Sequence, residues 1–303
     1  MATEQVVLLP RANRLLVLLQ RGAKYSRKRP VVAFWTTVML LVVLSAVLAP
    51  VFAPFEPNKQ HYQHLLKPPL SVGAEGKVHL AGTDQFGRDQ FSRLLYGARV
   101  SLTVSIIAVM LGTLVGSMYG TVSGYLMGKI DILMQRVSDA MDSIPTIVLA
   151  MLLVAIGGTN LLFIPFAIAF TQVPRTNRVV RSAVLAVREE TYVEAARAVG
   201  APPLRIILRH ILPNVMAPIL ILVSLAVGAA IVIEATLSFL GLGVQLPNPS
   251  WGNMLAIEGR DYMIEAPWLF ALPTVAISVT VLAFNFVGDA LRDAWDPRLR
   301  GSR

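Results

Sequence analysis

Six apolar runs, separated by polar segments, divide this chain of 303 residues. They cover residues 31–53, 101–125, 144–156, 161–171, 215–240 and 268–287. A helix needs about 20 mostly apolar residues to cross a bilayer. The third and fourth runs are shorter than that, so we expect these helices to extend into the flanking polar residues. The pattern predicts an all-α polytopic membrane protein with six transmembrane helices.

A charged stretch, residues 189–213, lies between the fourth and fifth apolar runs. Good helix formers precede Gly200, and glycine readily takes the left-handed conformation in which helices end. Two prolines follow, and apolar residues then recur at helical spacing from Leu204 to Ile211. We therefore expect a short helix, a tight turn and a second amphipathic helix that stops at Pro213.

This stretch also resembles a known motif. Glu194-Ala195-Ala196, followed by Gly200 and then by Leu212-Pro213, is similar to the EAA loop of ABC-importer permeases. The resemblance implies a cytoplasmic coupling helix that docks into a groove on an ATPase subunit. It assigns coupling to Tyr192, Glu194, Ala195, Ala196, Gly200, Ala201, Arg209, His210, Leu212 and Pro213. The family usually has isoleucine at the position of His210. The alternative is a helix–turn–helix between two spans that has no partner.

Residues 82–93 carry a second resemblance. Their sequence, Gly-Thr-Asp-Gln-Phe-Gly-Arg-Asp-Gln-Phe-Ser-Arg, resembles a signature of the "C" permease subunit of dipeptide, oligopeptide and nickel importers. We expect a short external helix at 82–99, with two interpretations. Either its arginines contact lipid phosphates, or the segment contacts a binding protein or the partner permease. The residues concerned are Asp84, Arg88, Asp89 and Arg93.

Three further segments, 234–243, 249–252 and 288–298, resemble the same subunits. This resemblance implies that the last five helices form a type I ABC-importer permease core, of the MetI-like kind. It also implies the bacterial cytoplasmic (inner) membrane. The expected organisation is a cytoplasmic tail at 1–30, a transmembrane helix with an external segment at 31–99, and the permease core at 100–303.

Glycine recurs every fourth residue in and after the second apolar run, at Gly112, Gly116, Gly120, Gly124 and Gly128. On a helix this spacing leaves a groove without side chains, along which another helix can approach closely. We expect a packing role for this groove rather than a binding site.

Composition and charge agree with a membrane protein. The chain is 55% hydrophobic and only 15% charged, whereas soluble domains have about 25% charged residues. The net charge of +9 is better explained by loop position than by nucleic-acid binding. Six spans with both termini inside place 20 Lys and Arg residues on the cytoplasmic side and 7 outside. The positive-inside rule therefore favours this orientation.

We find no residue constellation that indicates an enzyme. The chain has no cysteine, and none of its four histidines, His61, His64, His79 and His210, lies in an apolar run. No G-x-x-x-x-G-K-[ST] motif occurs, so we expect no cofactor in this chain and place ATP and Mg²⁺ in partner ATPase subunits. No metal-ligand spacing is evident.

One acid, Glu234, lies well inside an apolar run, the fifth, and the amide residue Asn285 lies inside the sixth. An ionisable residue in a membrane helix should face protein or water. Glu234 therefore either lines a solute pathway or makes a hydrogen bond between helices, and Asn285 has the same two interpretations.

The sequence thus predicts half of a heterodimeric pathway that imports peptides or a related small solute. The partners implied by the resemblance are a second permease, two ABC ATPases and an extracytoplasmic solute-binding protein, all assembled at a lipid bilayer. A transporter driven by an ion gradient would need more intramembrane charges and internal repeats. That transporter and a non-transporting membrane scaffold are the alternatives.

Overall fold

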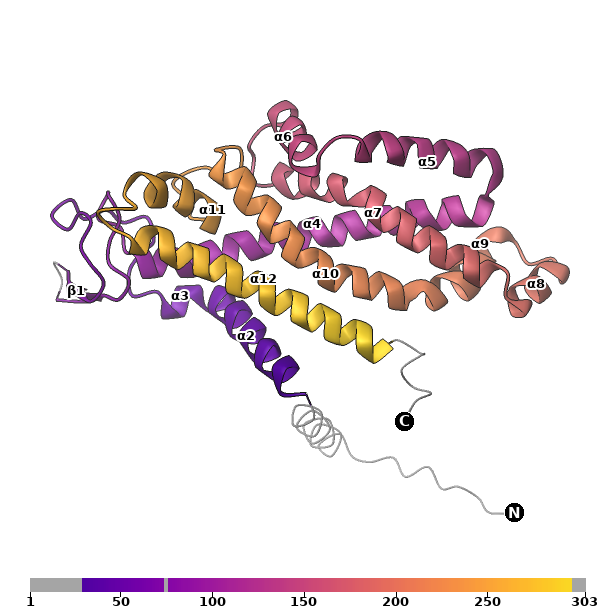
Figure 1. The fold of residues 1–303 in the computed structure, drawn as a ribbon, viewed down its shortest axis with the longest axis horizontal. Coiled ribbons are helices and arrows are strands. Elements are labelled where there is room, and N and C mark those ends of the chain that lie inside the picture. The colour runs from indigo at the N-terminus through magenta and orange to yellow at the C-terminus, as the bar shows by residue number, and fades with distance from the viewer. Residues whose placement is uncertain (1–28, 74–75, 296–303) are drawn as a thin grey trace, which may run out of the picture.

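Long helices lie side by side along the long axis of the molecule (Figure 1). The computed structural model describes residues 29–73 and 76–295. Its long helices are α2 (Pro30–Val47), α4 (Gln90–Leu126), α7 (Phe163–Arg188), α10 (Leu212–Phe239) and α12 (Trp268–Trp295). Two shorter helices, α5 (Gly128–Asp142) and α6 (Thr146–Gly157), contact α7. The predicted all-α fold is confirmed.

Six membrane spans are not confirmed. Among the described residues, four helices are long and apolar enough to cross a membrane: α2, α4, the helix that includes α10, and α12. The pair α5 and α6, bent by 91°, adds a fifth if it is counted as one broken span. Most of the expected fourth span, 161–171, forms the start of α7, which begins at Phe163 and whose second half carries arginines and is therefore less apolar.

Helix α4 is continuous where the sequence suggested two elements. The helical part of the expected external segment 82–99 and the span at 101–125 belong to one helix of 37 residues, which starts at Gln90. The Asp89 side chain caps this helix by accepting a hydrogen bond from the Ser92 N–H group. A run of buried residues from Gln90 onward keeps the first turns of α4 inside the protein.

The glycine groove of α4 receives α7. A Cβ atom on Gly112 would lie 2.7 Å from the Ala169 carbonyl oxygen, and one on Gly120 would lie 2.6 Å from the Asn177 carbonyl oxygen. The predicted packing role is therefore confirmed for the first four glycines. Gly128 is not part of the groove, because α4 ends at Leu126 and Gly128 begins α5 with φ +60°.

Gly120→Val should lower the free energy of unfolding by about 1–3 kcal/mol, because overpacking forces the backbones of α4 and α7 apart. Met118→Val is the matched control, since Met118 is exposed on the same helix. Thermal unfolding of the two purified variants in detergent checks this expectation. Equal melting temperatures for both variants would contradict close packing at this groove.

The first helix packs against the last one. The ring of Trp35 in α2 stacks on that of Phe286 in α12, with centroids 5.2 Å apart. Nearby, the Arg29 guanidinium lies 3.1 Å from the Asp293 carboxylate. The two ends of the described chain therefore lie on the same side of the molecule. The expected cytoplasmic tail, residues 1–30, lies almost entirely outside the described residues.

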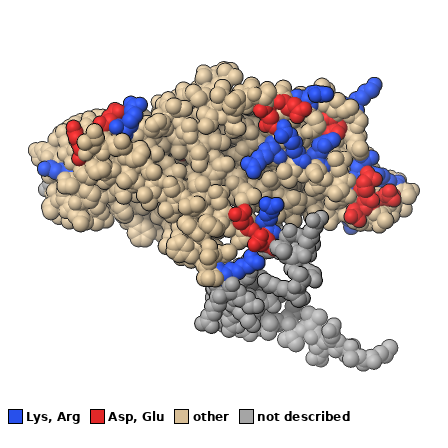
Figure 2. All heavy atoms as spheres, viewed as in Figure 1, with Lys and Arg blue, Asp and Glu red and all other residues tan. Residues whose placement is uncertain are grey.

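Short elements gather at the two ends of the helical bundle (Figure 1). One end, called here the β1 end, carries α3 (Ala49–Phe52), the antiparallel pair β1 (Ser71–Val72) and β2 (Val78–His79), α11 (Trp251–Asn253) and the π-helical turn η2 (Met254–Gly259). The other, the α8 end, carries α8 (Thr191–Ala198), α9 (Pro203–Ile206) and the π-helical turn η1 (Ile207–Ile211). On the face shown in Figure 2, charged side chains gather toward both ends and leave a belt without them between. Such a belt suits a lipid bilayer.

Candidate functional site

The connection between α7 and α10 forms a compact loop at the α8 end (Figure 1). Glu190 is the N-cap residue of α8, and the helix terminates before Gly200, whose φ is +78°. Two hydrogen bonds close this terminus: the Ala201 N–H donates to the Ala196 carbonyl (3.1 Å) and the Gly200 N–H donates to the Arg197 carbonyl (2.9 Å). This pair of bonds is a Schellman motif. The predicted short helix and tight turn are confirmed.

One face of this loop is anchored to the bundle. Its buried apolar residues form one cluster with residues of α7 and α10: Val180, Val184, Val193, Ile206, Ile211, Val215 and Ile219. The Arg197 guanidinium also lies over the ring of Tyr125 in α4, 5.7 Å from its centroid. The loop therefore contacts three long helices, and a displacement of the loop must move them or break this cluster.

The opposite face of the loop is exposed and partly apolar. Val199 is 83% exposed and Leu204 is 67% exposed, and Leu208 and Tyr192 are exposed beside them. The apolar spacing that begins at Leu204 predicts that this residue packs against the bundle together with Ile211. This was wrong for Leu204, and Ile206 is buried instead. Exposed apolar side chains on a loop that is itself anchored indicate a docking surface.

The ten residues assigned to coupling divide between these faces. Exposed are Tyr192, Glu194, Ala195, Gly200, Arg209 and Pro213, and half-buried are Ala196, Ala201, His210 and Leu212. The ring of His210 lies 6.3 Å from that of Tyr192, between their centroids. The loop thus brings both halves of the motif together in space.

The second helix of the loop does not stop at Pro213. It continues as η1 and α10 to Phe239, so that the loop and the following span form one helical rod. In η1 the Leu212 N–H bonds to the carbonyl of Ile207, five residues earlier. This wider π turn precedes Pro213, which has no N–H group to donate and stands in the first turn of α10. A rod of this kind is suited to transmit motion from the loop into the bundle.

A buried polar network next to the loop joins α4, α5 and α7. Arg181 forms two hydrogen bonds with the Asp131 carboxylate, at 2.7 and 2.5 Å. The hydroxyl of Ser123 bonds to the same carboxylate, and Gln135 donates to Ser123 at 2.8 Å. Asn177 extends the network by donating to Gln135 at 3.2 Å. This network ties the N-terminal turn of α5 to the last turns of α4 and to α7.

Glu234 is fully buried where α10 meets α4 and α11. The Ser238 hydroxyl donates to Glu234 Oε1 at 2.8 Å, and the hydroxyls of Ser101 and Ser250 face the same carboxyl group. This enclosure supports the hydrogen-bonding interpretation of Glu234. Asn285 is half-buried beside Gly228, more than a helical turn from Glu234 along α10, so the structure does not bring the two predicted residues together.

Glu234→Lys should prevent stable assembly, because a buried charge without a partner costs about 3–5 kcal/mol. Glu234→Gln, which keeps a hydrogen-bond acceptor, should assemble normally and transport solute. Size-exclusion chromatography of the complex, followed by a transport assay, checks both variants. A Glu234→Gln complex that assembles but does not transport would instead favour a role on the pathway.

A second buried network occupies the β1 end. Arg88 donates to Asp84 Oδ2 at 2.6 Å and to Glu258 Oε1 at 2.8 Å. Arg93 donates to the same Glu258 oxygen at 2.7 Å, and the His79 Nδ1 atom lies 2.8 Å from Asp89 Oδ1. Burial raises the pKa of Glu258 to about 7, while the charges of the two arginines oppose this rise.

These contacts correct the expectation for residues 82–93. Both interpretations required exposed side chains, but Asp84, Arg88, Asp89 and Arg93 are at most 3% exposed. Their charges are satisfied inside the chain, by one another and by His79 and Glu258. The signature therefore connects the segment that precedes α4, the start of α4 and η2 into one unit.

Two family models match this sequence. The model described as "binding-protein-dependent transport system inner membrane component" matches residues 109–301, which is more than half of the chain. The chain belongs to this family. A second model, the "N-terminal TM domain of oligopeptide transport permease C", matches residues 20–69 of this permease.

Named relatives are similar over most of their length. A putative peptide transport system permease protein of Brucella suis is 43% identical over 267 residues, which are 87% of this chain and 86% of the relative. A di/tripeptide transport system permease protein of Pseudomonas aeruginosa is 41% identical over 264 residues, 87% of each chain. A glutathione transport system permease protein of Pectobacterium atrosepticum is 39% identical over 278 residues, 91% of this chain and 90% of the relative.

The fold resembles a solved structure of the methionine ABC transporter MetNI in an inward-facing conformation. The TM-score is 0.54 at 19% sequence identity, and the match covers 66% of this permease and 95% of that chain. This likeness confirms the predicted MetI-like fold. The chain is accordingly a multi-pass inner-membrane permease component of an ABC transport system, a family that is not itself catalytic.

Sequence reasoning missed the two buried networks of this permease. Asp131 and Arg181 are 50 residues apart, and Arg93 and Glu258 are 165 apart. In the sequence, Asp131, Arg181 and Glu258 are single charges near apolar runs, and Arg93 is part of the signature at residues 82–93. The available signal was their position, because a charge inside a helix of a membrane protein normally has a partner. No rule of sequence spacing identified which oppositely charged residue was the partner of each charge.

Proposed function

We propose that this permease forms one half of a heterodimeric pathway that imports short peptides or a related small solute, driven by ATP. Relatives of similar length are named as peptide, di/tripeptide and glutathione permeases, which supports this solute class. The proposed partners are a second permease subunit, two ABC ATPases that hold ATP and Mg²⁺, and an extracytoplasmic binding protein. The chain itself would hold no cofactor.

The exposed face of the α8 loop is the observation that carries this proposal. Its apolar side chains, among them Val199 and Leu204, need a protein partner, while the buried face of the same loop holds α7 and α10. An ATPase that closes on ATP would push this loop, and the rod from Pro203 to Phe239 would carry the motion into the membrane. The loop then acts as a lever without an energy source of its own.

This function sets the orientation that we propose. The α8 end faces the cytoplasm, together with both termini, and the β1 end faces outward. The basic residues of the loop and of the N-terminal segment support this assignment by the positive-inside rule. Arg29 and Asp293, at the ends of the described chain, lie together on one side of the bundle, as this orientation requires. The binding protein would deliver solute at the β1 end.

Reconstitution of the complete complex in liposomes tests the function. Labelled dipeptides, longer peptides, glutathione and a nickel chelate are offered together with the binding protein, with and without ATP on the ATPase side. We expect ATP-dependent movement of at least one peptide-like solute across the bilayer. Transport that requires an imposed ion gradient and does not depend on ATP would contradict the proposal and favour a secondary transporter.

A further inference from the structure

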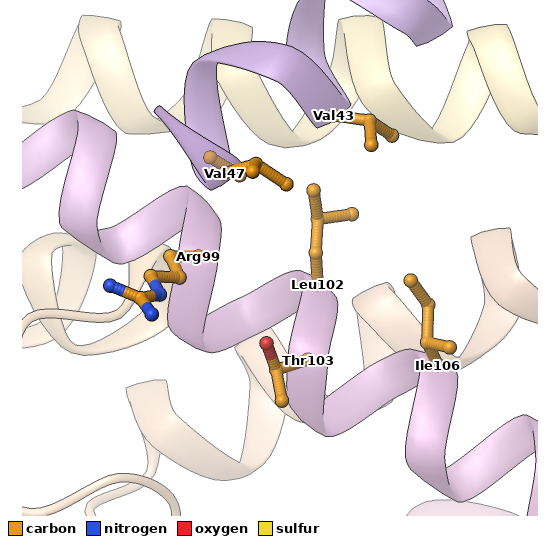
Figure 3. A pocket seen from close by; sticks show the side chains of 7 residues that line it. Val43, Val47, Arg99, Leu102, Thr103 and Ile106 are labelled. Atoms are coloured by element: carbon orange, nitrogen blue, oxygen red, sulfur yellow. The ribbon is translucent and has the colours of Figure 1, made fainter. Parts of the chain in front are cut away.

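Arg99 of α4 stands between two apolar grooves at the surface of the bundle. The first groove has a volume of about 200 Å³ and lies between α2 and α4. Figure 3 shows the side chains of Val47 and Leu102 facing each other across it, with Arg99 at its edge. The second has a volume of about 260 Å³ and is lined by α4 and by Leu161, Leu162 and Pro165 near the start of α7. Arg99 borders both.

The charge of Arg99 has no partner within the described part of the chain. Its neighbours Arg88 and Arg93 are buried and paired with carboxylates, whereas Arg99 is exposed and takes part in none of the ion pairs found there. An arginine on the membrane-facing side of a helix is costly unless an anion or water reaches it. We therefore expect an anion from outside the chain to neutralise the charge of Arg99.

The position of Arg99 along the bundle indicates which anion can reach it. Val47, which lines the first groove, is the last residue of α2, and Leu162, which lines the second, directly precedes α7. Both neighbouring helices thus end at this level, on the side of the β1 end. Further into the bundle, the exposed side chains of α4 are Thr103 and then apolar residues such as Met110. Arg99 thus lies where the apolar surface begins, at the level of lipid phosphates.

We propose that Arg99 binds the phosphate of a phospholipid in the leaflet at the β1 end, and that the two acyl chains of this lipid lie in the two grooves. Guanidinium groups bind phosphate through paired hydrogen bonds. The apolar walls supply shape rather than a hydrophobic driving force, because the surrounding lipid is equally apolar. The lipid would straddle α4 and hold α2 at a defined distance from α7.

Native mass spectrometry of the complete complex tests this site. The complex is taken from nanodiscs of phosphatidylethanolamine and phosphatidylglycerol, and the phospholipids that it retains are counted. We expect Arg99→Gln to lose one retained phospholipid per chain. Thr103→Trp should lose the same lipid while the charge remains, because Thr103 borders both grooves. Arg260→Gln is the matched control, since Arg260 is exposed at the same end and pairs with Asp261.

Two results would overturn the proposal. One is an unchanged number of retained phospholipids in both Arg99→Gln and Thr103→Trp. The other is loss of the second permease from the Arg99→Gln complex, which would show that Arg99 pairs with that subunit. Arg99→Lys, which keeps the charge but not the paired hydrogen bonds, should retain the lipid at an intermediate level.

Discussion

Gly200→Val should uncouple ATP hydrolysis from transport while leaving membrane insertion normal. Gly200 has φ +78°, a conformation that costs other residues about 1–2 kcal/mol, and a β-branched side chain suits it especially poorly. A cost of roughly 1.4 kcal/mol shifts an equilibrium tenfold, so we expect transport-coupled ATPase activity to fall about tenfold or more. The measurement is ATPase activity of the reconstituted complex with and without loaded binding protein.

The structure separates this effect from a steric one. A Cβ atom on Gly200 would have no atom within 4 Å, so valine at this position meets open space and acts only through the backbone. Gly200→Asn is the matched control, because asparagine tolerates the left-handed conformation better than other side chains. We expect this variant to keep most of its coupling. Normal coupling in Gly200→Val would count strongly against a rigid lever.

Glu258→Ala should lower the free energy of unfolding by about 3–5 kcal/mol, the usual cost of breaking a buried ion pair. The substitution leaves the Nη2 atoms of Arg88 and Arg93 without the acceptor that they share. Both guanidinium groups are buried, so water cannot replace the lost carboxylate without opening the structure.

Thermal unfolding of the purified protein at pH 8 measures this effect. This pH is above the pKa of Glu258, about 7, so the carboxyl group is ionised. Glu265→Ala serves as the control, since Glu265 is an exposed acid at the same end. Glu258→Gln should fall between the two, because it keeps one acceptor oxygen but no charge. A Glu258→Ala protein as stable as the control would contradict the buried network.

Local signals in the sequence predicted the helices and the loop well. The apolar runs located every long helix, since length and hydropathy decide which segments can enter a membrane. Gly200 and the residues around it predicted the turn at the end of α8, because a Schellman motif depends on neighbouring residues alone. The glycine spacing predicted a close helix contact but did not identify α7 as the partner.

What the sequence did not reveal depends on tertiary contacts. A proline after a helical stretch normally indicates the end of the helix. At Pro213, however, the π turn η1 comes directly before α10 and the helix continues. The signature at Asp84 to Arg93 indicated an exposed surface, because its main counterion, Glu258, lies far away in sequence. Leu204 fits the apolar spacing of its helix, but it is exposed, and Ile206 packs against residues of α7 and α10 instead. In each case a distant or non-local contact overrides a local pattern.

Site-specific crosslinking tests the lever most directly, because the chain has no native cysteine and accepts single ones without background. Val199→Cys places a thiol on the exposed face of the α8 loop, and Ile264→Cys places one at the β1 end. We predict that Val199→Cys crosslinks to an ATPase subunit, with a yield that changes when ATP binds, and that Ile264→Cys does not. Crosslinking of the ATPase at position 264, or none at position 199, would contradict the account.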